Sequence, residues 1–237
     1  MRSGVFVSVI LPTFNEKDNI LILIDRIHEE LSGMHHQIIV VDDNSPDGTY
    51  RVVKEKNYGF VKTILRTSEP SLARSIRVGL QEADGNIFVV MDSDFNHQPH
   101  YIPRMVKNLE FYDCVVASRF VYGGSMDSRW RHILSWVFNI FVRALTGKFI
   151  TDSLYGFFAV HRSVMEKLDY DKIFWGYGDY CIRFMYYLQG TGAEILQVPV
   201  INGRRLKGQG NSRFLKVFVQ YAMETIRLVL RERLKFK

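Results

Sequence analysis

The 237-residue chain has only two cysteines and six prolines, and it has no run of about 18 or more apolar residues. Cys114 and Cys181 stand outside any CxxC spacing, which disfavours a zinc site or a disulfide and favours two buried thiols. Apolar runs this short do not span a bilayer as a helix. The first residues also lack the zones of a signal peptide, so we expect a cytoplasmic protein.

The basic residues are concentrated in two segments. Residues 129–148 hold four basic residues and no acidic one, and residues 211–237 hold seven basic residues against two acidic ones. Because the whole chain carries a net charge of +6, the remainder is slightly acidic. This distribution argues against nucleic acid as a partner and favours two basic elements that face some other anionic partner.

The first 120 residues alternate apolar runs of strand length with segments of helical periodicity. We expect strands at 5–11, 37–41, 61–65, 86–91 and 114–118, and helices between Asn15 and Gly33, at 49–57 and at 72–83. Asn15 is placed to cap the first of these helices. The alternation predicts an α/β fold with a mostly parallel, doubly wound sheet that has helices on both faces.

Polar residues follow each predicted strand, and parallel strands end at one rim of the sheet, where such folds bind their ligands. The residues at this rim are Thr13, Asn15, Glu16, Asp42, Asp43, Arg66, Asp92, Asp94, Ser118 and Arg119. One rim therefore collects carboxylates and arginines.

Asp92 and Asp94 follow the fourth strand directly, with Asn96 as a third oxygen donor. Mg²⁺ takes one or two carboxylates and completes its shell with water and substrate phosphate, so we expect a metal site here, although a solvated acidic turn has the same pattern. Asp42 or Asp43 can accept from a nucleotide, or can form a turn. Arg119 and Arg131 suit phosphate recognition.

The second half begins with a predicted helix at 131–145, where Arg131, Ser135, Asn139 and Arg143 form one polar stripe in a largely apolar segment. This pattern fits a core helix with a solvated stripe, or a helix at a membrane surface or beside the active site. Strands are expected at 155–160 and 195–200, and Asp179 begins or caps a helix. A long amphipathic helix ends the chain.

These motifs together resemble the family 2 glycosyltransferases of the GT-A type, and within them the dolichyl- or polyprenyl-phosphate mannose synthases. The matching stretches are LPTFNE at 11–16, VVDDNSPDGT at 40–49, MDSDFNHQP at 91–99, SRF at 118–120, DSLYGFFAVHR at 152–162 and GNSRF at 210–214. The resemblance covers nearly the whole chain, and DDNSPDGT is its most specific part.

The resemblance implies inverting transfer of a hexose to polyprenyl or dolichyl phosphate with Mg²⁺ or Mn²⁺, from GDP-mannose or alternatively a UDP-hexose. It assigns nucleotide-sugar binding to Pro12, Thr13, Asn15, Glu16, Asp42, Asp43 and Asp92, and metal binding to Asp92, Asp94 and Asn96. It assigns acceptor or phosphate binding to Arg119, Arg131, Ser135, Lys207 and Arg213, with Asp94, Arg119 and Arg131 also catalytic. The implied domains are a GT-A catalytic domain at 1–210, with a nucleotide half at 1–120 and an acceptor half at 121–210, and a basic amphipathic helix at 211–237.

The chain departs from that family in several places. Residues 69–74 replace a glycine-rich stretch, Asn96 and Tyr155 stand where Gln and Ser are usual, and GYGDY at 176–180 resembles the acidic loop of relatives that glycosylate a hydroxyl. A hydroxyl acceptor needs a general base, which Asp179 could be, whereas a lipid phosphate does not. A glycan-directed enzyme, a degenerate module that binds nucleotide or a partner, and a nucleotidyltransferase therefore stay open.

The basic tail bears on where the protein works. A basic helix with an apolar face suits reversible binding to an anionic bilayer, and this favours a peripheral protein at the cytoplasmic membrane face. A membrane-protein partner with an acidic groove, or packing of the apolar face on the catalytic domain, would give the same pattern.

Overall fold

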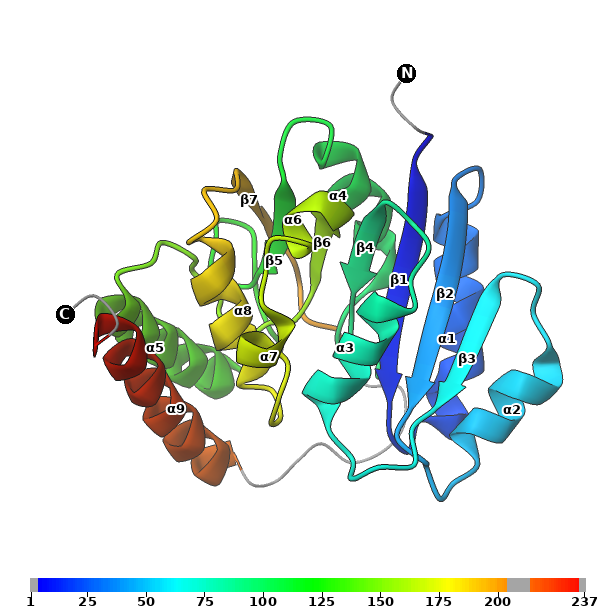
Figure 1. The fold of residues 1–237 in the computed structure, drawn as a ribbon, viewed down its shortest axis with the longest axis horizontal. Coiled ribbons are helices and arrows are strands. Elements are labelled where there is room, and N and C mark those ends of the chain that lie inside the picture. Colours follow the sequence, from blue (N-terminus) through cyan, green and yellow to red (C-terminus); the bar gives the residue numbers. More distant parts are fainter. Residues whose placement is uncertain (1–3, 204–213, 235–237) are drawn as a thin grey trace.

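The computed structural model describes residues 4–203 and 214–234, and its centre is a seven-stranded sheet with the order β3-β2-β1-β4-β6-β5-β7 (Figure 1). All strands run parallel except β6, which is antiparallel to both of its neighbours. The strands are β1 (Phe6–Thr13), β2 (His35–Asp42), β3 (Val61–Leu65), β4 (Ile87–Val90), β5 (Cys114–Ser118), β6 (Phe158–His161) and β7 (Ile195–Pro199). The predicted mostly parallel, doubly wound α/β fold is confirmed.

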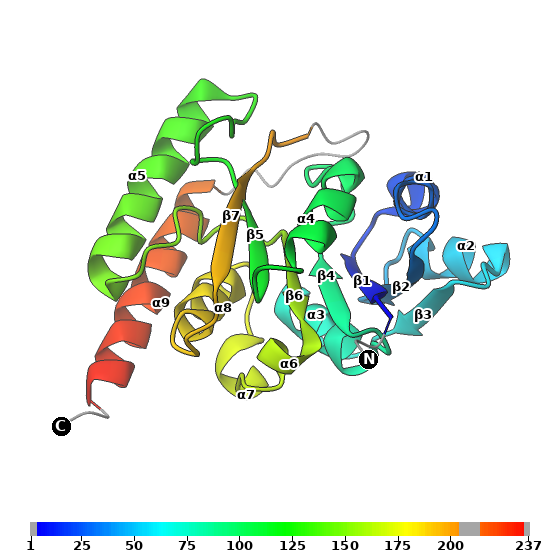
Figure 2. The ribbon, with the colours of Figure 1, turned by 90° about the horizontal axis from the view of Figure 1, so that it is seen from above.

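Helices cover both faces of the sheet (Figure 2). They are α1 (Lys17–Glu30), α2 (Thr49–Lys56), α3 (Leu72–Gln81), the 3₁₀ turn η1 (Pro99–Tyr101), α4 (Ile102–Asn108), α5 (Arg129–Thr146), α6 (Arg162–Met165), α7 (Tyr170–Ile173), α8 (Tyr180–Leu188) and α9 (Phe214–Leu234). One core joins α1, α2 and α4 to the sheet, and a second joins α3, α6, α7 and α8 to the other face. A third, smaller core joins α5 and α9 to α8.

Alternation along β1 explains the two large cores. Val7, Val9 and Leu11 point into the α1 side, whereas Ile10 points into the α3 side. On α3, a Cβ at Gly79 would lie 2.4 Å from the Ile10 side chain, so glycine is needed for the helix to pack this closely. The close packing holds α3 directly against Ile10 of β1 and Val41 of β2.

The prediction that Asn15 caps α1 is wrong. Asn15 adopts a left-handed backbone conformation with φ 60°, and the N-cap residue is Glu16, which makes no side-chain capping bond. The Asn15 N–H instead donates to Ser45 Oγ at 2.9 Å, which ties the end of β1 to the turn after β2. Asn tolerates this conformation better than most residues, which explains its presence in the turn.

Helix α5 buries polar side chains and exposes apolar ones along part of its length. The centre of its polar stripe, Ser135 and Asn139, is buried, whereas Trp130, Ile133, Val137 and Ile140 are each between 43% and 68% exposed. The interpretation of a core helix with a solvated polar stripe is therefore wrong.

Helix α9 has apolar residues on two sides. Tyr221, Leu228 and Val229 are buried, and Val219, Met223, Ile226, Leu230 and Leu234 are each between 43% and 70% exposed. In the described parts of the chain, no helix is both long and apolar enough to cross a membrane. Cys114 and Cys181 are free and buried as predicted, and burial raises the pKa of both thiols.

Candidate active site

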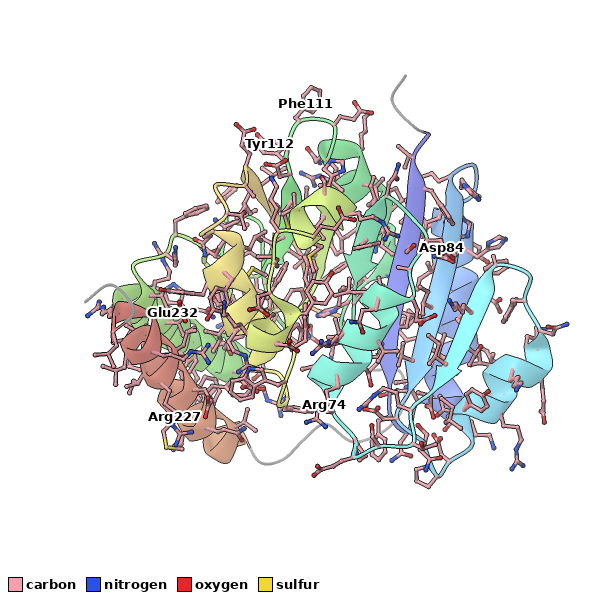
Figure 3. All side chains as sticks on the ribbon, viewed as in Figure 1. Arg74, Asp84, Phe111, Tyr112, Arg227 and Glu232 are labelled. Carbon is pink, nitrogen blue, oxygen red and sulfur yellow. The ribbon has the colours of Figure 1, made fainter. Side chains whose placement is uncertain are left out.

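The parallel strands end at one rim of the sheet, at the bottom of Figure 1, and the predicted site residues of β1, β2, β4 and β5 follow these ends. In Figure 3, Arg74 of α3 lies at this end of the molecule, whereas Phe111 and Tyr112 lie at the opposite end. The predicted rim is therefore a real edge of the fold.

Asp42 holds the end of β1 against the turn after β2. Its buried carboxylate accepts from Ser45 N at 2.8 Å, Ser45 Oγ at 2.6 Å and Thr13 Oγ1 at 3.0 Å. Pro12 is tied to the next loop, because its carbonyl accepts from Ser93 Oγ at 2.9 Å. These bonds fix the predicted nucleotide-binding segment in one shape.

Asp43 organises the start of α3. Its carboxylate pairs with Arg66, accepts from Ser75 Oγ at 2.7 Å and accepts from Ser71 N at 2.8 Å. Ser71 Oγ in turn donates to Gly176 O at 2.7 Å. Two stretches in which the sequence departs from its resembled family, 69–74 and 176–180, are thus joined by a hydrogen bond.

Glu16 is the remaining acid beside β1. It is buried, and its Oε2 accepts from Asn19 Nδ2 at 2.6 Å while its backbone N–H donates to Thr49 Oγ1 at 3.0 Å. These bonds join the start of α1 to the start of α2. The nucleotide-binding roles assigned to these residues stay predictions, and what the structure adds is a rigid frame around them.

The candidate metal ligands lie on the tight turn after β4. The Asp94 carboxylate accepts from Asn96 N at 3.0 Å and from Asn96 Nδ2 at 2.7 Å, and Phe95 between them has φ 65°. The Asp92 side chain is 40% exposed. A left-handed phenylalanine is strained, so this turn is held in place by its surroundings.

His97 is the main support of that turn, and the sequence pattern gave it no role. It is buried, accepts from Asp92 N through Nδ1 at 2.8 Å, and stacks on Phe157 with ring centroids 5.1 Å apart. Burial lowers its pKa to about 3, partly offset by Asp94. Tyr155 adds a second support, because its hydroxyl donates to Asn96 O at 3.0 Å.

This turn suits a hard divalent cation. Asp92 and Asp94 supply carboxylate oxygens at a strand end, and among the described residues no cluster of three His, Cys, Asp or Glu side chains forms a closed cage. An open two-carboxylate site leaves positions for substrate phosphates, as Mg²⁺ sites usually do. Asn96 Oδ1 lies 3.4 Å from Asn202 Nδ2, so the third predicted ligand also joins the turn to the segment after β7.

Arg119 forms a buried ion pair with Asp152. The Arg119 Nε and Nη2 atoms donate to the two Asp152 oxygens at 2.8 and 2.9 Å, and Arg119 N donates to Oδ2 at 3.1 Å. The guanidinium also lies 4.7 Å from the centroid of the Tyr155 ring. The sequence indicates Asp152 only as part of the DSLYGFFAVHR stretch, and its charge explains how Arg119 can be buried.

Arg131 is exposed in the first turn of α5, near the Arg119 segment. The Phe120 and His132 rings pack edge to face with centroids 4.9 Å apart, so the residues that follow the two arginines are in contact. Farther along α5, Asn139 Oδ1 accepts from Ser153 N at 2.7 Å. Lys207 and Arg213, predicted to bind the acceptor, lie outside the described residues.

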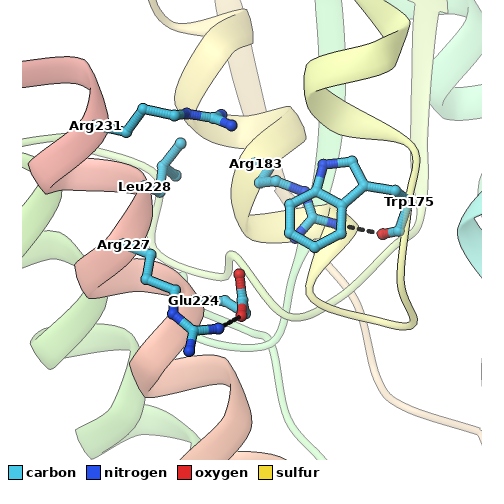
Figure 4. A pocket seen from close by; sticks show the side chains of 6 residues that line it. All are labelled: Trp175, Arg183, Glu224, Arg227, Leu228 and Arg231. Atoms are coloured by element: carbon cyan, nitrogen blue, oxygen red, sulfur yellow. Dashed lines mark hydrogen bonds and ion pairs between the residues drawn. The ribbon is translucent and has the colours of Figure 1, made fainter.

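Asp179 precedes α8 but does not cap it with its side chain. Its carboxylate pairs with Arg183 and accepts from Tyr177 N at 3.0 Å, and the whole residue is buried. Arg183 stacks on Trp175 at 3.7 Å, in a pocket of about 280 Å³ where the loop before α8 meets α9 (Figure 4). Both Asp179 oxygens already have a partner, which favours a structural role over that of a proton acceptor.

The chain is similar to known proteins over most of its length. Residues 8–169 match the family model of glycosyl transferase family 2. The chain is 33% identical to a dolichol-phosphate mannosyltransferase of Pyrococcus furiosus, over 94% of this chain and 63% of the relative. It is 31% identical to a polyprenol monophosphomannose synthase of Mycolicibacterium smegmatis, over 81% of this chain and 75% of the relative.

A solved structure of similar fold is the glucosyl-3-phosphoglycerate synthase of Mycobacterium tuberculosis in complex with Mn²⁺, UDP and phosphoglyceric acid. It superimposes with a TM-score of 0.72 at 21% identity, over 95% of this chain and 78% of that one. The chain spans only about two thirds of the length of the Pyrococcus relative.

Proposed function

Because the chain belongs to glycosyl transferase family 2, we propose that it moves a hexose from a nucleotide sugar to a polyprenyl or dolichyl phosphate. The observation that carries this proposal is the Asp92–Asp94 turn at the rim of the sheet. The Asp92 side chain is accessible to solvent, and hydrogen bonds with His97 and Tyr155 support the turn. The names of the relatives favour mannose as the sugar, and the resemblance of the motifs favours GDP-mannose as its donor.

The proposed reaction breaks the bond between the sugar C1 and the donor diphosphate and forms a bond from C1 to an acceptor phosphate oxygen, with inversion. Asp92 and Asp94 would hold Mg²⁺ or Mn²⁺, which supplies positive charge to the leaving diphosphate. The solved structure with Mn²⁺ and UDP supports this use of a metal in the same fold. Arg119 would lie close to the phosphates, with Asp152 fixing its guanidinium.

A phosphate acceptor fits the surroundings of Asp179 better than a hydroxyl acceptor does. A lipid phosphate is already anionic and needs no base, whereas a hydroxyl must lose a proton to a nearby acceptor. Asp179 is buried and is engaged by both Arg183 and the Tyr177 N–H. This arrangement supports the lipid phosphate.

The outer face of α5 and α9 supports work at a membrane surface. Trp130, Ile133, Val137 and Ile140 of α5 lie at three- and four-residue spacing, so they form one exposed apolar stripe. Contiguous exposed apolar patches of this kind are rare on monomers and mark interaction sites. We infer that this face rests on a bilayer at its cytoplasmic side.

The charges on the same two helices favour an anionic bilayer over a second copy of the chain. Arg129, Arg131 and Arg143 are exposed on α5, which has no acidic residue. On α9, Glu224 pairs with Arg227, and the side chains of Glu224 and Glu232 are only 15% and 13% exposed. A symmetric dimer would bring basic residues together, whereas anionic lipids would attract them.

Replacing Ile133 and Val137 together by aspartate is expected to reduce binding to anionic vesicles by at least about 10-fold, because both apolar side chains are removed from the membrane interface. Sedimentation with phosphatidylglycerol vesicles measures this. Phe111→Asp is the control, since Phe111 is 73% exposed and lies at the end of the molecule opposite to Arg74 (Figure 3). An equal loss of vesicle binding in both variants would contradict a lipid surface. So would a wild-type protein that binds only to a membrane-protein complex and not to the vesicles.

Transfer itself is tested with Mg²⁺, labelled GDP-mannose and polyprenyl phosphate. We expect label in the organic phase and release of GDP, and a parallel screen with UDP-sugars identifies the donor. Release of pyrophosphate would indicate a nucleotidyltransferase. Metal-dependent nucleotide binding without transfer to any acceptor would indicate a non-catalytic module and would overturn the proposal.

A further inference from the structure

Helix α9 presents one side chain from its inner face to the candidate site. Tyr221 is 9% exposed, and it lies on the side of α9 opposite to the exposed Val219, Met223 and Ile226. Its ring belongs to the small core shared with Phe138 of α5 and Ile182 of α8. The sequence pattern predicts only a basic amphipathic helix here and indicates no role for Tyr221.

The Tyr221 hydroxyl occupies space that a glycine leaves open. A Cβ at Gly178 would lie 2.2 Å from the Tyr221 hydroxyl oxygen, so any other residue there would displace it. Tyr180 and Gly156 form a second pair of this kind, because a Cβ at Gly156 would lie 2.3 Å from the Tyr180 hydroxyl oxygen. Two glycines of the site region therefore make room for two phenol groups.

Neither hydroxyl is used by the rest of the described fold. Within residues 4–203 and 214–234, the hydroxyls of Tyr180 and Tyr221 form no hydrogen bond, whereas the Tyr155 hydroxyl donates to Asn96 O. Both side chains are buried, yet neither hydroxyl oxygen is cut off from solvent, so each can donate a hydrogen bond to a ligand that enters at this rim.

The pKa of the Tyr221 hydroxyl is affected by acidic residues of the site. Burial raises the pKa of Tyr221, and the charges of Asp179 and Asp92 raise it further. Burial and Asp92 raise the pKa of Tyr180 in the same way. Both phenols therefore stay protonated and act as neutral hydrogen-bond donors.

We propose that the Tyr221 hydroxyl binds the acceptor, by donating a hydrogen bond to a phosphate oxygen of the polyprenyl phosphate. The inference rests on the proposed function. Helix α9 would then complete the site with its inner face while its outer face lies on the bilayer from which the lipid arrives. The nucleotide is assigned to residues around Pro12 and Asp43, so Tyr221 is expected to affect binding of the acceptor and not of the nucleotide.

Tyr221→Phe is the direct test, because it removes the hydroxyl and keeps the ring in its core. A hydrogen bond to a charged group corresponds to about a 10-fold or larger effect, so we expect the KM for polyprenyl phosphate to rise by about that factor. Affinity for GDP with Mn²⁺, thermal stability and vesicle binding should all stay as in the wild type. Tyr186→Phe, on the adjacent α8 but with its pKa raised by burial and by Glu232 instead of the site acids, is the matched control.

Several outcomes overturn the inference. Unchanged KM and kcat with polyprenyl phosphate would do so, as would a loss of affinity for GDP alone or an equal effect in Tyr186→Phe. If the wild-type protein transfers no sugar to any lipid phosphate, the proposed function fails separately. In that case, calorimetry with a ten-carbon prenyl phosphate in the presence of GDP and Mn²⁺ tests whether the Tyr221 hydroxyl contributes to binding of the phosphate. Weaker binding by Tyr221→Phe supports the site, and equal or absent binding in both proteins rejects it.

Discussion

Replacing Asp152 by asparagine is expected to lower the free energy of unfolding by about 3–5 kcal/mol, the cost of leaving one partner of a buried ion pair without its counter-charge. Arg119 is 8% exposed and Asp152 is completely buried, and three hydrogen bonds join them. Asparagine keeps the shape of the side chain but not its charge. The midpoint of urea unfolding, followed by tryptophan fluorescence and circular dichroism together, measures the change.

The exposed pair of Arg26 and Glu29 provides the control for this prediction. Their side chains are 65% and 63% exposed, so Glu29→Gln should cost well under about 1 kcal/mol. The double variant Arg119→Met with Asp152→Asn should be more stable than Asp152→Asn alone, because it removes the unpaired buried charge. A midpoint for Asp152→Asn equal to that of Glu29→Gln would show that the pair is not buried in solution.

The sequence predicted the sheet well because its strands are short apolar runs between helices of clear periodicity. The same reasoning brought Asp43, Asp92 and Arg119 to one rim, since parallel strands end on one side. Local rules were less reliable. Asn15 has the residue type of a cap, but the contact of its backbone with Ser45 favours a left-handed turn instead.

Long-range pairing explains what the sequence could not show. Periodicity indicates that Ser135 and Asn139 share a face of α5. It does not indicate that this face is buried, because the burial depends on contacts with a distant segment, such as the hydrogen bond from Ser153 N to Asn139 Oδ1. The pairing of Arg119 with Asp152 and the approach of Tyr221 to Gly178 likewise depend on how distant segments fold together. The sequence signals for these contacts are polar residues inside apolar helices and glycines within the aromatic-rich segments.

Replacing Asp92 by asparagine is expected to reduce the rate of sugar transfer by about 1,000-fold, equivalent to roughly 4 kcal/mol of transition-state stabilisation. Asparagine keeps the volume of the side chain, and the bond to His97 Nδ1 uses only the backbone N–H of residue 92, so the turn should persist. The variant loses a charged ligand for the metal that offsets charge on the leaving diphosphate. Steady-state transfer at saturating Mg²⁺ or Mn²⁺ measures the effect.

Metal titration separates this role from a structural one. Mn²⁺ with GDP should raise the melting temperature of the wild type and of Asp84→Asn, an exposed carboxylate away from the metal turn (Figure 3), but raise that of Asp92→Asn much less. Removal of the metal from the wild type with a chelator should reproduce the rate of the variant. Transfer by Asp92→Asn within about 10-fold of the wild type, or activity that survives chelation, would mean that the two carboxylates form only a solvated turn.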